Sequence, residues 1–227
     1  MSESIQTLAS IQSDFDRIAL LPPDAWDHNT HYHPWLLAQI PTHCKRILEI
    51  GCGTGSFTRL LGQRADSVLA IDLSPEMIRL AQEQSSIHPN IDFVVGDALS
   101  YEFGEEQCDC ITSLTTIHHL SMAAILDRIK GALKPGGIFV CLDLYKRSTL
   151  TDLLIDGVAY FSSPFLRLIK TGKPRPDKHW RVAYDEHGKT DTYLALSEIR
   201  QLCADALPGA VVRRHLFWRY SIIWKKE

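Results

Sequence analysis

Three glycines stand close together in GluIleGlyCysGlyThrGly, at residues 49–55, and could bring a ligand against bare backbone. The segment lies between an apolar run and a helical pattern, which predicts a turn from a strand into a helix. Glycine permits the tight turn, and the start of the helix adds unpaired N–H donors. The NAD and FAD fingerprint, GxGxxG, would need a glycine where Ser56 stands, so the observed GxGxG spacing disfavours a dinucleotide.

Two carboxylates follow the next two predicted strands, and both suit an adenosine. Asp72 ends the strand at 67–72 and is placed to accept hydrogen bonds from both ribose hydroxyls. Asp97, in GlyAspAlaLeu at 96–99, could accept from the adenine amine, with Ala98 and Leu99 flanking the ring. Each carboxylate alone also fits an ordinary turn. The two are evidence for an adenosine site only in combination with the glycines upstream.

Imidazole and phenol groups are the candidates for acid–base chemistry. HisAsnThrHisTyrHis at 28–33 precedes the first strand, and we expect Tyr32 or His33 to contact the cofactor or substrate. His118 follows the fourth predicted strand and Tyr145 the fifth, which makes both candidate catalytic residues. A metal site would require accompanying carboxylates or cysteines at ligand spacing, and the six cysteines form no CxxC pair. We therefore expect no metal and reduced, buried thiols.

Short apolar runs alternate with helical patterns from residue 46 onward, which is typical of βαβ units and a parallel sheet. The patterns predict strands at 46–50, 67–72, 91–95, 108–114 and 138–144, and helices at about 56–64, 75–84, 121–134 and 197–206. Two final strands, at about 211–217 and 220–225, are joined too closely for a parallel crossover and form an antiparallel hairpin. We expect an α/β fold with a Rossmann-like seven-stranded sheet, five parallel strands plus this hairpin, and helices on both faces.

The domain organisation follows from where this regularity stops. Residues 1–45 precede the first strand and predict an N-terminal helical cap. Residues 46–227 form the main domain, in which the alternation breaks at about 146–190 and predicts a lid-like insertion. That insertion holds a basic stretch, 165–181, with six basic residues against the single acidic Asp177.

Four ordered motifs together resemble the class I S-adenosylmethionine-dependent methyltransferases, of the small-molecule type. They are the glycine turn at 49–55, the acidic strand end at Asp72, GlyAspAla at 96–98 and LeuLysProGlyGly at 133–137. The resemblance covers about residues 46–145 and the terminal hairpin. It implies S-adenosyl-L-methionine as cofactor and S-adenosyl-L-homocysteine as product.

The resemblance also implies which residues meet the cofactor. Glu49, Gly51 and Gly53 would line its methionine part, and Ser113 would face the sulfonium side. Met77 would flank the adenine, although its place on the apolar face of a helix is equally explained by core packing. The expected cofactor-binding set is Tyr32, Glu49, Gly51, Cys52, Gly53, Asp72, Leu73, Met77, Asp97, Ala98, Leu99 and Ser113.

The acceptor is the least determined feature. The basic stretch lies where such enzymes often build a substrate lid, which leads us to expect an acidic small molecule. Nucleic-acid methyltransferases of this fold that act on base amines carry Asn/Asp-Pro-Pro-aromatic after the fourth strand, where this chain has SerLeuThrThrIleHisHis. A nucleic-acid methyltransferase, a non-catalytic S-adenosylmethionine-binding module and an NAD-dependent oxidoreductase are the alternatives. An aminopropyl transferase would need acidic residues for a polyamine, and we find no such set.

Composition is that of an ordinary globular protein. Hydrophobic residues make up 45% and charged residues 22% of the 227 residues, with a formal net charge of −3. This balance gives no general attraction to nucleic acid or to an anionic membrane. No secretory signal and no membrane-spanning run is visible, so we expect a cytoplasmic monomer or homodimer.

Overall fold

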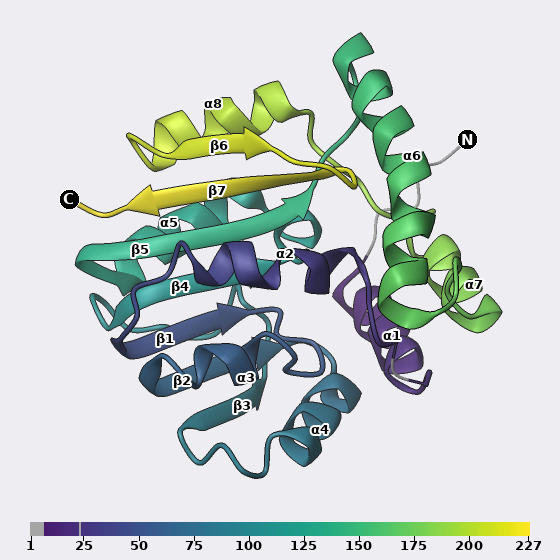
Figure 1. Cartoon of the computed structure of the whole chain (residues 1–227). Coiled ribbons are helices and arrows are strands. Elements are labelled where there is room, and N and C mark those ends of the chain that lie inside the picture. Colours follow the sequence, from purple (N-terminus) through teal and green to yellow (C-terminus); the bar gives the residue numbers. More distant parts are fainter. Residues whose placement is uncertain (1–6, 23) are drawn as a thin grey trace.

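The computed structural model describes residues 7–22 and 24–227, whose strands form one seven-stranded sheet (Figure 1). The order is β3-β2-β1-β4-β5-β7-β6, in which the first five strands are parallel and the last two antiparallel. The strands are β1 (Cys44–Ile50), β2 (Ala65–Asp72), β3 (Ile91–Val95), β4 (Cys108–Leu114), β5 (Leu133–Leu144), β6 (Val211–Arg214) and β7 (Arg219–Lys225). The predicted Rossmann-like sheet with a C-terminal antiparallel pair is confirmed.

The helices alternate with the parallel strands, as the periodicity predicts. They are α1 (Leu8–Ala19), α2 (His28–Leu37), α3 (Thr58–Leu61), α4 (Pro75–Gln84), α5 (Met122–Ala132), α6 (Leu150–Thr171), α7 (Lys178–His187) and α8 (Leu196–Ala206), with a short 3₁₀ turn, η1 (Ile117–His119). Ser74 caps α4 by accepting a hydrogen bond from the Met77 backbone N–H, and Pro75 takes the first helical position.

Both faces of the sheet are buried, which explains why its strands are continuously apolar. On one face, Ile125 and Ile129 of α5 and Ile199 of α8 belong to one core cluster. On the other, Leu36 of α2 and Leu61 of α3 belong to a second. The helices therefore cover both faces and leave the ends of the strands for a ligand.

Two strand boundaries differ from the prediction by three residues or more. Leu133 already pairs with Cys108, so β5 begins five residues earlier than expected and includes the LysProGlyGly segment. β6 ends at Arg214 instead of residue 217, because Phe217 and Trp218 take φ of 59° and 61°. That left-handed backbone cannot continue a strand and instead turns the chain into β7.

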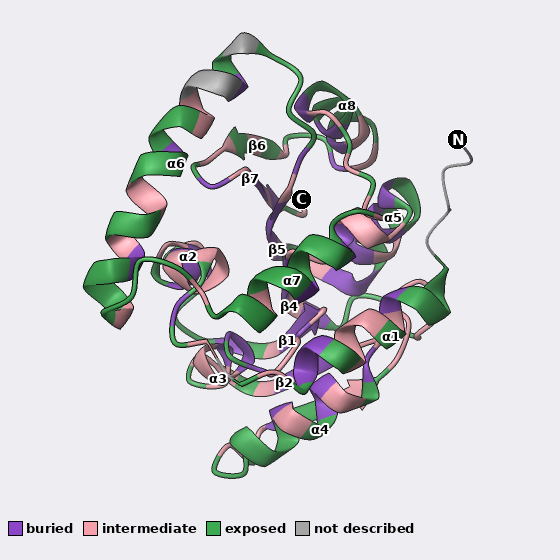
Figure 2. Cartoon of the chain, turned by 90° about the vertical axis from the view of Figure 1, so that its right-hand side faces the viewer, coloured by how far each residue is buried: buried purple, intermediate pink, exposed green. Residues whose placement is uncertain are grey.

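Helices from both ends of the chain gather beyond the carboxyl ends of the parallel strands. There α1 packs against α7, α6 lies on the far side of α7 from α1, and α2 reaches the same edge with its first turns (Figures 1 and 2). Arg167 of α6 pairs with Asp24, and the Trp180 indole of α7 donates to the carbonyl of Pro22. Residues 1–6 and 23 of the predicted cap lie outside the described residues. In the described part of the chain, no helix is both long and apolar enough to cross a membrane.

Candidate active site

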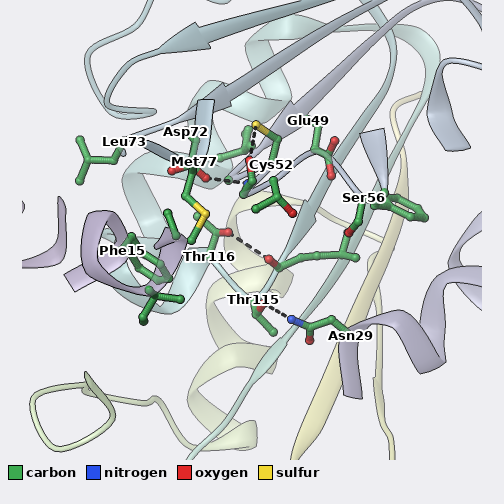
Figure 3. A pocket seen from close by; sticks show the side chains of 18 of the residues that line it. Phe15, Asn29, Glu49, Cys52, Ser56, Asp72, Leu73, Met77, Thr115 and Thr116 are labelled. Atoms are coloured by element: carbon green, nitrogen blue, oxygen red, sulfur yellow. Dashed lines mark hydrogen bonds between the residues drawn. The ribbon is translucent and has the colours of Figure 1, made fainter. Parts of the chain in front are cut away.

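A pocket opens at the carboxyl ends of β1 to β4, where an open α/β sheet binds its ligands. Its floor is the glycine turn and the strand ends, and α1, α2 and α7 contribute its roof (Figure 3). The sequence-predicted residues that line it are His33, Glu49, Gly51, Cys52, Gly53, Asp72, Leu73, Met77, Asp97 and Ala98. Local patterns therefore predict most of the floor.

The glycine turn shapes the pocket at two positions, for different reasons. Gly51 has φ +74°, and a Cβ there would lie 1.9 Å from Thr116 Oγ1, so only glycine fits. Gly53 has φ +51°, and a Cβ there would meet no atom within 4 Å. The peptide at Gly53 thus faces open pocket and offers a ligand bare backbone.

Asp72 is fixed in place by the turn beside it. The backbone N–H of Gly53 donates to its Oδ2 at 2.8 Å, and that of Ser74 donates to Oδ1 at 2.9 Å (Figure 3). Burial nevertheless raises the pKa of Asp72 above its ordinary value. Each oxygen keeps a further lone pair, so the carboxylate can accept from a polar ligand.

Glu49 is a buried carboxyl group without a partner for one of its oxygens. The residue is 1% exposed, and its Oε2 has no hydrogen-bond partner. Burial raises the pKa of Glu49 to about 8. A buried polar atom of this kind is costly unless something binds it, and the α-ammonium of S-adenosylmethionine has the charge to do so. The donor set therefore fits that cofactor.

The residues expected around an adenine lie together, with one exception. Leu73, Met77, Asp97 and Ala98 all line the pocket, and Met77 also joins the small apolar cluster with Ile18. Leu99 does not line the pocket, so its predicted role beside the adenine has no support from the lining. The Asp97 side chain accepts from the Leu99 N–H, and the Leu99 side chain packs against the main core instead.

Four other predicted site residues lie outside the pocket lining, because each side chain makes a structural contact. The Tyr32 hydroxyl donates to the carbonyl of Leu216, and that of Ser113 donates to the carbonyl of Ile50. Tyr145 donates to Asp152 from a buried position. Their predicted roles at the cofactor or acceptor stay predictions that the pocket lining does not support. His118 also lies outside the lining and is held by Asp143.

Several lining residues come from segments where the sequence carries no chemical signal. Asn29 Nδ2 donates to Thr115 Oγ1 at 2.9 Å, and its own Oδ1 accepts from Arg219, 190 residues away (Figure 3). Thr115 has φ +49°, a strained value for a residue with a side chain. The residues that sequence reasoning missed are Phe15, Asn29, Thr116, Trp180 and Tyr184. Only the helical pattern around Phe15 could have indicated one of them.

The basic stretch is not part of the pocket. None of its six basic side chains, all in the described part of the chain, is among the lining residues, and Arg167 is buried in its ion pair with Asp24. The lining contains no lysine or arginine at all within the described residues. The observation that motivated an acidic acceptor therefore lies elsewhere on the molecule.

Comparison with known proteins identifies this architecture. Residues 48–141 match the methyltransferase domain family. An uncharacterized methyltransferase of Mycobacterium tuberculosis is 27% identical over 205 residues, which is 88% of this chain and 96% of that protein. Residues 48–141 thus form a methyltransferase domain similar to those of S-adenosylmethionine-dependent enzymes.

Other similar proteins share the fold with different stated activities. The ubiquinone biosynthesis O-methyltransferase of Xylella fastidiosa is 29% identical over 165 residues, 66% of each chain. The N-methyltransferase NodS of Bradyrhizobium japonicum, solved with S-adenosylhomocysteine, aligns with TM-score 0.64 at 18% identity, covering 95% of this chain and 97% of its own. A Haloferax volcanii putative methyltransferase, solved with the Trm112 activator, aligns with TM-score 0.66 at 19% identity, covering 93% and 96%. This methyltransferase thus has relatives with several kinds of acceptor.

Proposed function

We propose that this methyltransferase transfers the methyl group of S-adenosylmethionine to a small-molecule acceptor held beneath α1, α2 and α7. The observation that carries the proposal is the pocket at the strand ends. Its floor holds Glu49, Gly53 and Asp72, and its roof comes from segments on either side of the main domain in the sequence. A roofed chamber favours a small acceptor over a polymer, which would need an open groove.

The floor residues supply the cofactor contacts in this proposal. When bound, S-adenosylmethionine supplies an electrophilic methyl group on a positively charged sulfur. Glu49 would hold its ammonium group, Asp72 its ribose, and the bare peptide of Gly53 would lie against it. The adenine would lie among the remaining floor residues, Leu73, Met77, Asp97 and Ala98.

The chain's main catalytic task is then alignment of the acceptor and exclusion of water. Orientation of this kind contributes on the order of 7–11 kcal/mol to a displacement. His33 lines the pocket, and burial lowers its pKa below the ordinary value, so its imidazole is neutral at physiological pH. A neutral imidazole can accept a proton from an acceptor that arrives protonated.

Titration with S-adenosylhomocysteine tests the cofactor half of the proposal. We expect micromolar binding in the wild-type protein and loss of at least tenfold in affinity in Asp72→Ala, because the ribose loses its acceptor. Asp92→Ala, on the same sheet but outside the lining, is the matched control. Absence of binding to folded wild-type protein would remove the proposal, and NADH would be the next ligand.

Labelled methyl transfer tests the acceptor half. Incubation with methyl-labelled S-adenosylmethionine and separate pools of small metabolites, RNA and protein should label the small-molecule pool. Label confined to RNA or protein would favour a polymer-directed enzyme, and binding without any transfer would favour a non-catalytic module. Within the small-molecule pool, methylation of only neutral or cationic acceptors would contradict an acidic acceptor.

A further inference from the structure

Three imidazoles surround one carboxylate beside the pocket. His118, His119 and Asp191 each offer a ligand atom, and these atoms lie within 4.8 Å of one another. Asp191 Oδ1 is 3.7 Å from His119 Nδ1 and 3.6 Å from Nε2 of His187, and its Oδ2 is 3.9 Å from His118 Nε2. All four side chains are at most 5% exposed. The cluster unites η1, α7 and the segment after α7.

Two further carboxylates hold the outer nitrogens of this cluster. His118 Nδ1 lies 2.6 Å from Asp143 Oδ1, and His187 Nδ1 lies 3.2 Å from Asp14 Oδ2. A carboxylate that accepts from Nδ1–H leaves the lone pair on Nε2, and in both rings Nε2 is the atom nearer to Asp191. Carboxylate–histidine pairs of this kind orient the histidine ligands of metal ions.

His119 gives an independent indication that something binds here. Its side chain is 5% exposed, yet neither ring nitrogen has a hydrogen-bond partner. Buried polar groups are almost always satisfied, and this imidazole also lines the pocket. A cation between His119 and Asp191 would satisfy it.

We propose that His118, His119 and Asp191 bind a divalent transition-metal ion at the wall of the pocket. Imidazole and carboxylate donors suit zinc and its first-row neighbours. Zinc–ligand bonds of about 2.0–2.1 Å place tetrahedral ligands about 3.3 Å apart. The candidate ligand atoms, which lie within 4.8 Å of one another, would therefore move closer by up to about 1.5 Å on binding.

This ion would define the class of acceptor. Since no lysine or arginine lines the described pocket, a metal at His119 would be the cationic element of the acceptor chamber. It would select an acceptor with an anionic oxygen, such as a carboxylate or a phenolate. This consequence rests on the proposed function, whereas the metal site itself does not.

Cobalt titration of the full chain, with any affinity tag removed, tests the site. We expect one Co²⁺ per chain with the visible absorption of tetrahedral nitrogen and oxygen ligands, displaced by Zn²⁺. Asp191→Asn should weaken binding at least tenfold and remove the absorption, whereas His43→Ala, at the exposed His43–Asp66 pair, should change neither. S-adenosylhomocysteine binding by Asp191→Asn verifies that the variant is folded.

The outcomes separate this inference from the proposed function. No cobalt absorption in the wild type, or equal absorption in Asp191→Asn, overturns the metal site. Cobalt binding without S-adenosylhomocysteine binding leaves the metal site standing and removes the proposed function. Cobalt binding together with methylation of neutral acceptors only would overturn the assignment of an anionic acceptor.

A second, separate observation concerns the outer face of α6. Val158, Phe161, Phe165 and Ile169 follow one another at helical spacing and are 57%, 78%, 63% and 63% exposed. The opposite face, with Ala159 and Arg167, is buried against the body. Figure 2 shows the helix mostly in the colour of exposed residues along its length. A contiguous exposed stripe of four large apolar side chains marks an interaction surface.

The charge around the stripe indicates its occupant. Four exposed basic residues continue from its end, and residues 157–176 contain no aspartate or glutamate. These basic residues are Lys170, Lys173, Arg175 and Lys178. A second copy of this chain would bring the same uncompensated positive charge, whereas a surface of anionic lipids complements it. An amphipathic helix with aromatic and basic residues suits a membrane interface.

We infer that α6 lies flat on anionic lipid bilayers, with its apolar stripe in the interface. The full chain should sediment with phosphatidylcholine vesicles that contain phosphatidylglycerol and stay in the supernatant with phosphatidylcholine alone. Phe161→Asp with Phe165→Asp should reduce the bound fraction at least fivefold. Ile87→Asp is the matched control, because Ile87 is 83% exposed on another part of the surface.

Two results would overturn this inference. Wild-type protein that remains in the supernatant with anionic vesicles removes the membrane as occupant. A dimer that Phe161→Asp dissociates, with no vesicle binding, would assign the stripe to contact between copies of this chain.

Discussion

At the residue scale, Glu49 couples cofactor binding to a proton. Burial raises its pKa from the ordinary 4.5 to about 8 in the folded chain, because the buried carboxyl group resists ionisation. An ammonium group beside it would favour the charged form, so binding would release a proton. We expect the association constant for S-adenosylhomocysteine to rise up to about tenfold per pH unit below pH 8 and then to level off. Calorimetry from pH 6 to 8.5, in buffers of different ionisation enthalpy, measures this; a flat profile would contradict it.

Changing Glu49 should have opposite effects on folding and on cofactor binding. Between pH 4.5 and about 8 the unfolded chain has lost the Glu49 proton while the folded chain retains it, so stability falls as pH rises. Glu49→Gln should therefore raise the free energy of unfolding at pH 8 by a few kcal/mol, roughly 2–4, with little gain near pH 5. It should also weaken S-adenosylhomocysteine binding about tenfold or more.

Denaturant unfolding at pH 5 and pH 8 measures the expected gain in stability of Glu49→Gln, and ligand titration measures its expected loss of affinity. Glu76→Gln, on the exposed side of α4, is the control and should leave ligand affinity unchanged. A variant that is destabilised at pH 8, or that binds the ligand as well as the wild type, would argue against a ligand-facing carboxyl group.

At the element scale, the turn from β1 into α3 should respond differently to alanine at two positions. Gly51→Ala should lower stability by about 1–3 kcal/mol, because its methyl group would collide with the Thr116 side chain in a left-handed backbone. Gly53→Ala should cost about 1 kcal/mol from its positive φ alone, yet reduce S-adenosylhomocysteine affinity at least tenfold by filling the pocket. Thermal unfolding and titration of both variants measure the contrast. If Gly51→Ala and Gly53→Ala lost affinity in the same proportion to their loss of stability, the predicted contrast would be refuted.

At the scale of the whole molecule, one buried ion pair joins the roof of the pocket across the sequence. Arg167 of α6 pairs with Asp24 at 2.7 Å and donates to the carbonyl of Trp26, more than 140 residues earlier. Breaking a buried pair by removing one partner costs on the order of 3–5 kcal/mol. Arg167→Met should therefore speed amide hydrogen exchange in α1, α6 and α7 and leave β1 and β4 protected. Cofactor affinity should also fall in Arg167→Met.

Hydrogen exchange with mass spectrometry checks the Arg167→Met prediction. The matched control is Arg147→Met, because the Arg147–Asp156 pair has an exposed arginine and such pairs contribute about 0–1 kcal/mol. Faster exchange throughout the sheet would mean that the pair stabilises the entire fold and is not specific to the roof.

How much of the structure could be predicted from the sequence depends on how far apart in the chain the interacting residues are. The parallel sheet was predictable because each strand and helix has its own periodicity, and carboxyl ends of parallel strands share one edge. Glu49, Gly53 and Asp72 therefore met at one pocket as predicted. Leu99 and Tyr145 lie outside the pocket lining, because the direction of a side chain near a strand end depends on what packs beside it.

The sequence by itself determined the sheet, the glycine turn and the floor of the pocket, since these follow from local patterns and parallel connectivity. Only the tertiary structure decided the roof and the histidine cluster. His118 and His119 are neighbours in sequence, but Asp143 and Asp191 reach them from two other segments, and Asp14 reaches the nearby His187 from a third. No periodicity relates those segments. Their contact depends on how α1 and α7 fold back over the strand ends, and burial in that contact leaves His119 without a partner.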